Sequence, residues 1–146
     1  MYKRILIAIE HSAADRAIVD HVQPLARLCG ASLLLVHVAD GFVARAYDEL
    51  KLRDSHEIQD DRAYLDGLRD ELAGRGFAVE ALLAMGDPAK EIVRLAETES
   101  VDLVAMATHG HRLLKDIVLG ATVDKVRHAL KVPVLLLRSP GSSHPA

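Results

Sequence analysis

The chain has 146 residues, half of them apolar, and a formal net charge of −3 at pH 7, which is typical of one globular domain with its own hydrophobic core. Its single cysteine, Cys29, excludes an internal disulfide and a zinc site built from cysteines. The absence of tryptophan and of a basic field argues against nucleic-acid and anionic-membrane partners, and no apolar run approaches the roughly 20 residues of a membrane span.

Apolar runs and helical patterns alternate along the chain. Continuous apolar runs are typical of strands covered on both faces, and apolar residues spaced three and four apart indicate amphipathic helices. In chain order we predict a strand at residues 5–9, a helix at 13–29, a strand at 31–38, an irregular segment with some helical start up to about residue 55, a helix at 57–74, a strand at 77–84, a helix at 89–99, a strand at 103–107, a helix from about 121 to 130 and a strand at 134–138.

Capping residues separate these elements. Ser12 is the expected N-cap of the first helix, Asp15 adds negative charge to its first turn, and Gly30 ends it. Asp87 is the expected N-cap of the third helix, where Pro88 suits the first turn. The alternation predicts an α/β fold: a single open five-stranded parallel sheet with helices on both faces, in one domain at residues 1–138, followed by a disordered polar tail at 139–146.

The carboxyl ends of the strands are where such a sheet binds ligands. Four stretches supply these ends, at residues 9–12, 38–40, 86–88 and 107–110. The last leads into a loop that opens at Gly110 and closes at Gly120, just before the next helix, and backbone N–H groups in such a place can bind an anion. Glu10 would face this loop if the first and fourth strands are neighbours, which spacing alone does not establish.

The same loop resembles that of a known family. Ala107-Thr-His-Gly110, nine further residues and then Gly120-Ala121 are similar to the Gly-x-x-Gly-x9-Gly-Ser/Thr loop of the universal stress protein family. The resemblance extends over nearly the whole chain, through residues 3–10, 35–38, 86–92, 101–104 and 126–134. It implies a sheet ordered 3-2-1-4-5, a homodimer and, in one branch of the family, an ATP-binding cleft between the first and fourth strands.

The resemblance also implies roles for single residues. Glu10 matches an aspartate that binds the ribose, the backbone of Val38 would meet the adenine, and the glycine loop would wrap the phosphates. Three residues depart from the pattern: Glu10 is one methylene longer than aspartate, Ala107 replaces the first glycine, and Ala121 replaces the hydroxyl residue, a loss that Thr122 could compensate. Together these changes could weaken binding by about one to three orders of magnitude. The nucleotide-binding residues expected are Ala8, Ile9, Glu10, Val38, Met106, Ala107, Gly110, Arg112, Gly120, Ala121 and Thr122.

Arg112 and Lys115 lie inside the loop and have two interpretations, as phosphate ligands or as solvated charges. Of the histidines near the proposed cleft, His11, His109 and His111 could ligate a metal, but polar loop residues without a metal are the more common case. His37 lies within a predicted strand and is expected to make an internal hydrogen bond.

These features predict a cytoplasmic regulatory protein that binds ATP, with or without Mg²⁺, or a related adenine nucleotide. At most slow hydrolysis is expected, because no catalytic base or Walker-type lysine is visible. The expected homodimer uses the last strand, residues 134–137 (Val134, Leu135, Leu136 and Leu137), which would otherwise be an unpaired apolar edge. The alternatives are an interaction module without nucleotide and a metal-dependent hydrolase.

Overall fold

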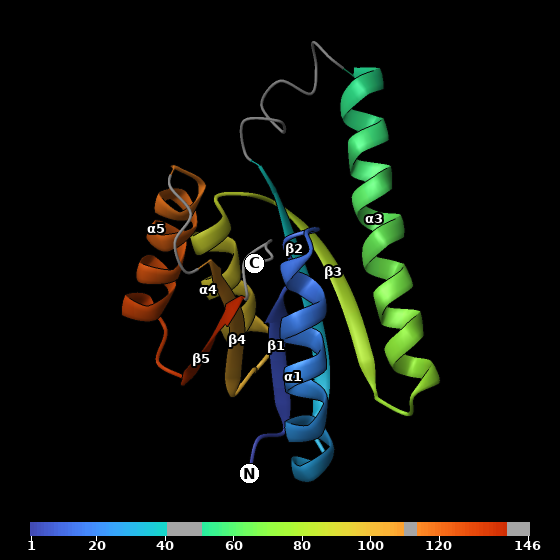
Figure 1. Cartoon of the computed structure of the whole chain (residues 1–146), viewed down its shortest axis with the longest axis vertical. Coiled ribbons are helices and arrows are strands. Elements are labelled where there is room, and N and C mark those ends of the chain that lie inside the picture. Colours follow the sequence, from blue (N-terminus) through green and yellow to red (C-terminus); the bar gives the residue numbers. More distant parts are fainter. Residues whose placement is uncertain (41–50, 110–113, 140–146) are drawn as a thin grey trace, which may run out of the picture.

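Five parallel strands form one sheet in the order β3-β2-β1-β4-β5 (Figure 1). The structure is a computed structural model, in which residues 1–40, 51–109 and 114–139 are described. The elements are β1 (Arg4–Ala8), α1 (Ala14–Cys29), β2 (Ser32–Asp40), α3 (Lys51–Gly74), β3 (Val79–Gly86), α4 (Pro88–Thr98), β4 (Leu103–His109), α5 (Leu114–Ala129) and β5 (Val134–Ser139). The predicted fold class and strand order are confirmed.

β1 lies at the centre of the sheet and pairs with two strands. Its Ile7 is in register with Leu35 of β2 on one side and with Ala105 of β4 on the other. The first and fourth strands are therefore neighbours, which the sequence alone left open. The chain reverses its direction of travel across the sheet at β1, and this is the point where open α/β sheets bind ligands.

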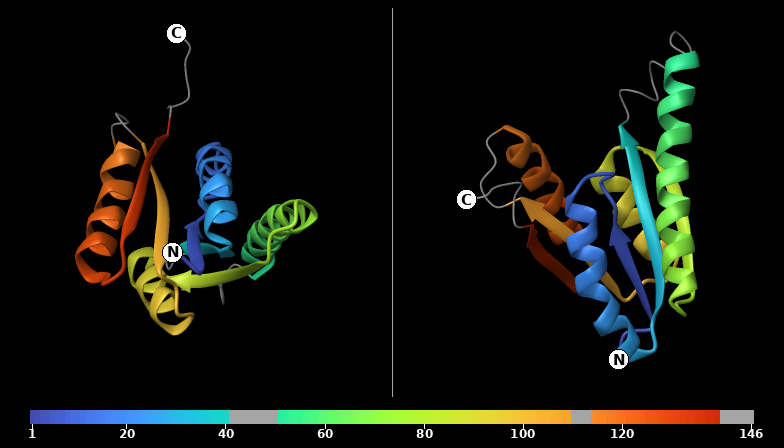
Figure 2. Two further views of the ribbon diagram at one scale, coloured as in Figure 1. Left: turned by 90° about the horizontal axis from the view of Figure 1, so that it is seen from below. Right: turned by 45° about the vertical axis from the view of Figure 1, so that its right-hand side comes forward.

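Helices cover both faces of the sheet, α1 and α3 on one and α4 and α5 on the other (Figure 2). Since successive strand residues point to opposite faces, Ile5 and Ile7 pack toward α1 and α3, and Leu6 and Ala8 pack toward α4 and α5. This double burial explains why the central strands are continuous apolar runs.

Two of the predicted helix boundaries have the geometry expected of them. Gly30 ends α1 in the left-handed region with φ 67°, where a side chain is unfavourable. Asp87 caps α4 by accepting a hydrogen bond from the backbone N–H of Lys90 at 3.0 Å, and Pro88 is the first residue of that helix.

Three sequence predictions about helix starts are wrong. Helix α5 begins at Leu114 instead of about residue 121, because residues 114–119 can all adopt a helix and the single Gly120 costs only about 1 kcal/mol. Helix α3 begins at Lys51, six residues before the predicted start. Ser12 is not the N-cap of α1: Ala13 occupies that position, and alanine has no polar side chain to cap the helix. The backbone N–H of Ser12 is instead bound by Asp15 of the first turn.

The predicted tail lies outside the described residues except for Ser139, which ends β5. Within the described part of the chain, none of the helices is both long and apolar enough to cross a membrane.

Candidate functional site

A pocket of about 200 Å³ opens at the carboxyl ends of β1, β2 and β4. It lies at the switch point of the sheet, and the first turns of α4 and the middle of α5 complete its wall. Its lining residues are Ala8, Ile9, Glu10, Val36, His37, Val38, Pro88, Ile92, Met106, Ala107, Thr122 and Val123.

The walls of this pocket are mainly aliphatic, with Glu10, His37 and Thr122 as its polar side chains. Pockets for drug-sized ligands usually have roughly 300–1,000 Å³. At about 200 Å³ this pocket is smaller, so it suits one flat heterocycle whose polar substituents extend out of it.

Seven of the eleven predicted site residues line the pocket together: Ala8, Ile9, Glu10, Val38, Met106, Ala107 and Thr122. Gly110 and Arg112 lie outside the described residues. Gly120 and Ala121 are placed inside α5, six and seven residues after its start, and not at the mouth of a helix. The predicted loop that closes at Gly120 is therefore wrong for this structure, because helix α5 begins before it.

The sequence prediction missed five lining residues, Val36, His37, Pro88, Ile92 and Val123. Two of these residues could have been found from the sequence. Val36 lies two residues before Val38 and so shares its face of the strand, and Pro88 begins the helix that follows the neighbouring strand end.

The loop after β1 is organised by a buried carboxylate, that of Asp15, which is only 1% exposed. Asp15 Oδ1 accepts the backbone N–H of Glu10 at 2.8 Å, and Oδ2 accepts those of His11 at 2.8 Å and Ser12 at 3.0 Å. The hydroxyl of Tyr64 donates to the same Oδ2 at 2.6 Å. Four donors on one buried carboxylate satisfy its charge and fix the path of the loop.

This path places His11 at φ 65°, a conformation that is uncommon for residues other than glycine. Ser12 Oγ donates to Glu10 Oε1 at 3.2 Å and accepts from the backbone N–H of Ala14, also at 3.2 Å. The polar groups of Glu10 are thus oriented by bonds within the loop itself.

Tyr64 comes from α3 and contacts the loop twice. Its ring stacks on that of His11 with 4.0 Å between the ring centroids, in addition to its bond with Asp15. Burial, the hydrogen bond to Asp15 and the negative charge of that carboxylate raise the pKa of Tyr64 above its ordinary value of 10.0, so the hydroxyl stays a donor at neutral pH.

Two histidines share a second carboxylate of α3. His11 Nδ1 donates to Asp61 Oδ1 at 2.6 Å, and His37 Nε2 lies 3.4 Å from Asp61 Oδ2. His37 Nδ1 donates to the backbone carbonyl of Ile9 at 2.8 Å, which confirms the internal hydrogen bond predicted for this histidine.

A metal centre has no support in the described residues, where no group of three or more histidine, cysteine, aspartate or glutamate side chains could hold an ion. Of the three histidines considered, His11 is bound to Asp61, whereas the side chain of His109 and all of His111 lie outside the described part.

Comparison with known proteins places these features in a family. The model of the universal stress protein family matches residues 1–138. The universal stress protein MJ0577 of Methanocaldococcus jannaschii is 28% identical over an alignment of 162 positions, which covers 97% of this chain and 98% of that protein.

Solved structures agree. The structure of MJ0577 superposes with a TM-score of 0.81 and 29% identity, covering 97% of this chain and 99% of that chain. A universal stress protein in complex with cAMP (TM-score 0.68, 20% identity, 94% and 98% covered) and one from Archaeoglobus fulgidus in complex with dAMP (TM-score 0.68, 20% identity, 92% and 97% covered) share the fold.

Proposed function

Since the chain belongs to the universal stress protein family, we propose that it is a regulatory protein that binds an adenine nucleotide, ATP or a related one, in the pocket between β1 and β4. The observation that carries this proposal is the base-sized apolar pocket, which gathers seven of the residues expected to bind the nucleotide. Two solved structures of universal stress proteins with the same fold are in complex with adenine nucleotides, one with cAMP and the other with dAMP.

The lining residues fit the parts of a nucleotide. The aliphatic walls from Val36, Ile92 and Met106 suit the faces of an adenine ring, and the end of β2 at Val38 offers backbone groups to its edge. The Glu10 carboxylate, at the end of β1, is an acceptor for the ribose hydroxyls. Thr122 of α5 adds a hydroxyl to the same wall, at the position after Ala121.

The loop after β1 bears on where the phosphates would lie. Its backbone N–H groups at Glu10, His11 and Ser12 already donate to Asp15, so they are not available to an anion from outside. We therefore place the phosphates on the other side of the pocket, toward the connection from β4 to α5. Arg112 and Gly110 belong to that connection, and Mg²⁺ would act there as a counterion of the phosphates.

Isothermal titration with Mg-ATP, AMP and cAMP tests the proposal, together with analysis of nucleotides released when protein purified without added ligand is denatured. Thr122→Phe should fill the pocket and abolish binding, whereas Lys125→Phe changes an exposed residue one turn further along α5 and should leave it intact. If none of the nucleotides is released and none produces heat or a shift in melting temperature, the protein does not bind adenine nucleotides.

We further propose a homodimer through β5, which is an edge strand of the sheet. Leu136 on this strand is 42% exposed, a large apolar side chain beside an edge that could pair with a second copy. Sedimentation or light scattering should show a dimer that Leu136→Glu converts to monomer. The same substitution at Leu28, an 86% exposed residue at the end of α1, is the control and should leave the dimer intact. A wild-type monomer at high concentration would disprove this arrangement.

A further inference from the structure

Helix α3 contacts the pocket-forming loop through two side chains, Asp61 and Tyr64. They lie three residues apart and therefore on one face of the helix. Leu65, Leu68 and Leu72 of the same helix are buried in the core beneath α1 and α3, so the face is anchored to the sheet along its length. Helices α1 and α3 are also linked directly, since Arg16 of α1 donates to Glu71 of α3 at 2.7 Å.

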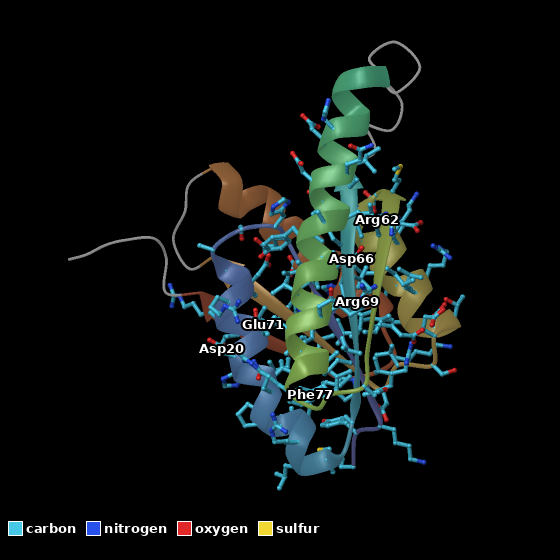
Figure 3. All side chains as sticks on the ribbon, turned by 90° about the vertical axis from the view of Figure 1, so that its right-hand side faces the viewer. Asp20, Arg62, Asp66, Arg69, Glu71 and Phe77 are labelled. Carbon is cyan, nitrogen blue, oxygen red and sulfur yellow. The ribbon has the colours of Figure 1, made fainter. Side chains whose placement is uncertain are left out.

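The outer face of α3 is charged and turned away from the sheet, as Arg62, Asp66 and Arg69 show in Figure 3. Asp66 and Arg69 pair with each other there at 3.3 Å. The carboxylate of Asp61, in contrast, is directed at His11 of the loop after β1 and at His37 of β2. Asp61 is thus an acidic residue of α3 whose contacts lie at the binding pocket.

A chain of contacts runs from Asp61 into the pocket wall. Asp61 Oδ2 faces His37 Nε2 at 3.4 Å, and the opposite nitrogen of that ring donates to the carbonyl of Ile9 at 2.8 Å. Because a carbonyl only accepts, Nδ1 of His37 must carry a proton, and Nε2 donates toward the Asp61 carboxylate when the ring carries its second proton as well. The backbone N–H of Ile9 donates to the carbonyl of Val36 at 2.7 Å, so Ile9 is held from both of its backbone groups.

The held segment is part of the site. Ile9, His37 and Glu10 all line the pocket, and Glu10 directly follows the carbonyl that His37 binds. A rotation of the His37 ring would release that carbonyl and leave Ile9 with its N–H bond to Val36, which loosens this part of the pocket wall. The His37 ring donates to Ile9 just after β1, faces Asp61 of α3 and meets the ring of His11 edge-on, with 6.3 Å between the ring centroids; Asp61 is the contact that comes from α3.

We propose that Asp61 is a positioning residue for the pocket: from α3 its carboxylate orients the His37 ring, which holds the Ile9 carbonyl, so ligand affinity depends on how α3 packs against the sheet. This inference rests on the proposed nucleotide site. It assigns a role to a helix that lies on the face of the sheet opposite α4 and α5. Asp61 does not touch the ligand; it acts through His37.

The first test uses the protein without ligand. Asp61→Asn and Asp60→Asn change neighbouring residues of α3 by the same charge, and Asp60 is exposed. In nuclear magnetic resonance spectra, Asp61→Asn should shift the ring nitrogens of His37 and the amides of Ile9 and Glu10, and Asp60→Asn should leave them in place. Unchanged signals in Asp61→Asn would overturn the inference whether or not the protein binds a nucleotide.

The second test is titration with Mg-ATP. Mutations within a coupling network change affinity by about two- to thirtyfold, and we expect a loss of this size for Asp61→Asn while the far-ultraviolet circular dichroism remains that of the wild type. Asp60→Asn should bind as the wild type does. Equal affinities of the two variants would refute a positioning role.

A double-mutant cycle separates action through His37 from a general loosening of the helix. If Asp61 acts through the ring, adding Asp61→Asn to His37→Gln should cost much less affinity than it costs alone. Additive losses would show that Asp61 influences the site by another route. Failure of the wild type to bind Mg-ATP would instead remove the proposed function, and the spectra without ligand would still decide whether Asp61 orients His37.

Discussion

Replacing Asp15 by alanine should lower the free energy of unfolding by about 3–5 kcal/mol. The carboxylate is 1% exposed and accepts four hydrogen bonds, three from backbone N–H groups and one from Tyr64. A hydrogen bond to a charged group contributes about 1.5–3 kcal/mol, but the loop is only partly buried, so water can satisfy some of the stranded donors and the sum is not reached. Domains are stable by only about 5–15 kcal/mol, so the loss is a large fraction of the total.

Asparagine at the same position should be intermediate. It keeps one acceptor oxygen, but its NH₂ group replaces the other. If the oxygen takes the place of Oδ2, which has three donors, the NH₂ group faces the backbone N–H of Glu10, and two donors then oppose each other. We expect a loss of about 1–3 kcal/mol, the cost of leaving a buried donor unsatisfied.

Urea denaturation followed by circular dichroism measures both variants. Asp20→Ala is the control, since Asp20 lies on the same helix, is more than half exposed and pairs with the exposed Arg16 and with Gln23, and should change stability by less than about 0.5 kcal/mol. Tyr64→Phe in the Asp15→Ala background should add almost nothing, because its bond partner is already gone. A loss below about 1 kcal/mol for Asp15→Ala would contradict the view that this carboxylate organises the loop.

Three further outcomes follow from single residues. Although burial opposes its ionisation, backbone N–H groups of Lys3, Arg4 and Asp102 itself hold the pKa of the Asp102 carboxyl below its ordinary value of 3.8. The Asp102 carboxylate therefore stabilises the fold above pH 3.8, and this stabilisation is lost as the pH falls through the lowered pKa. In acid titrations the difference in free energy of unfolding between wild type and Asp102→Asn should become smaller below pH 3.8. Gly30→Ala should cost about 1 kcal/mol in urea unfolding, since beyond its chain neighbours no atom of the described residues lies within 4 Å of the added Cβ and the left-handed backbone is what opposes it; no loss would exclude that strain. Asp87→Ala should cost about 1 kcal/mol by removing the N-cap of α4, and Asp87→Ser should restore most of it in the same assay.

The sheet could be predicted because each strand is recognisable from its own short stretch of sequence. The runs around Ile5, Leu33 and Val104 are apolar without interruption, and only a strand buried on both faces requires that pattern over so short a length. The order of the strands depends on which runs become neighbours, and local pattern contains no information on that. The resemblance to a known family supplied the order that the residues alone left open.

The start of α5 shows that a glycine in the sequence does not always mark the boundary of a helix. Glycine is common at the end of a loop, and Gly120 therefore predicts one, but a helix tolerates one glycine at about 1 kcal/mol when the flanking residues favour helix. The motif spacing to Gly120 therefore did not predict that the backbone before this glycine, from Leu114 on, is helical.

The carboxylates that orient the loop after β1 could not be predicted for a different reason. Asp15 was recognised only as a charge in the first turn of a helix, which is where it lies, but its role depends on a loop that turns back over it with His11 at positive φ. Its partner Tyr64 is 49 residues away in sequence, and Asp61 is 50 residues from His11. Helix α3 carries many acidic residues, and nothing in its periodicity distinguishes Asp61 from Asp60. Apolar pocket walls follow from strand ends, which are local, whereas the carboxylates that orient the loop act across elements, and only the packing of α3 beside α1 decides which of them do so.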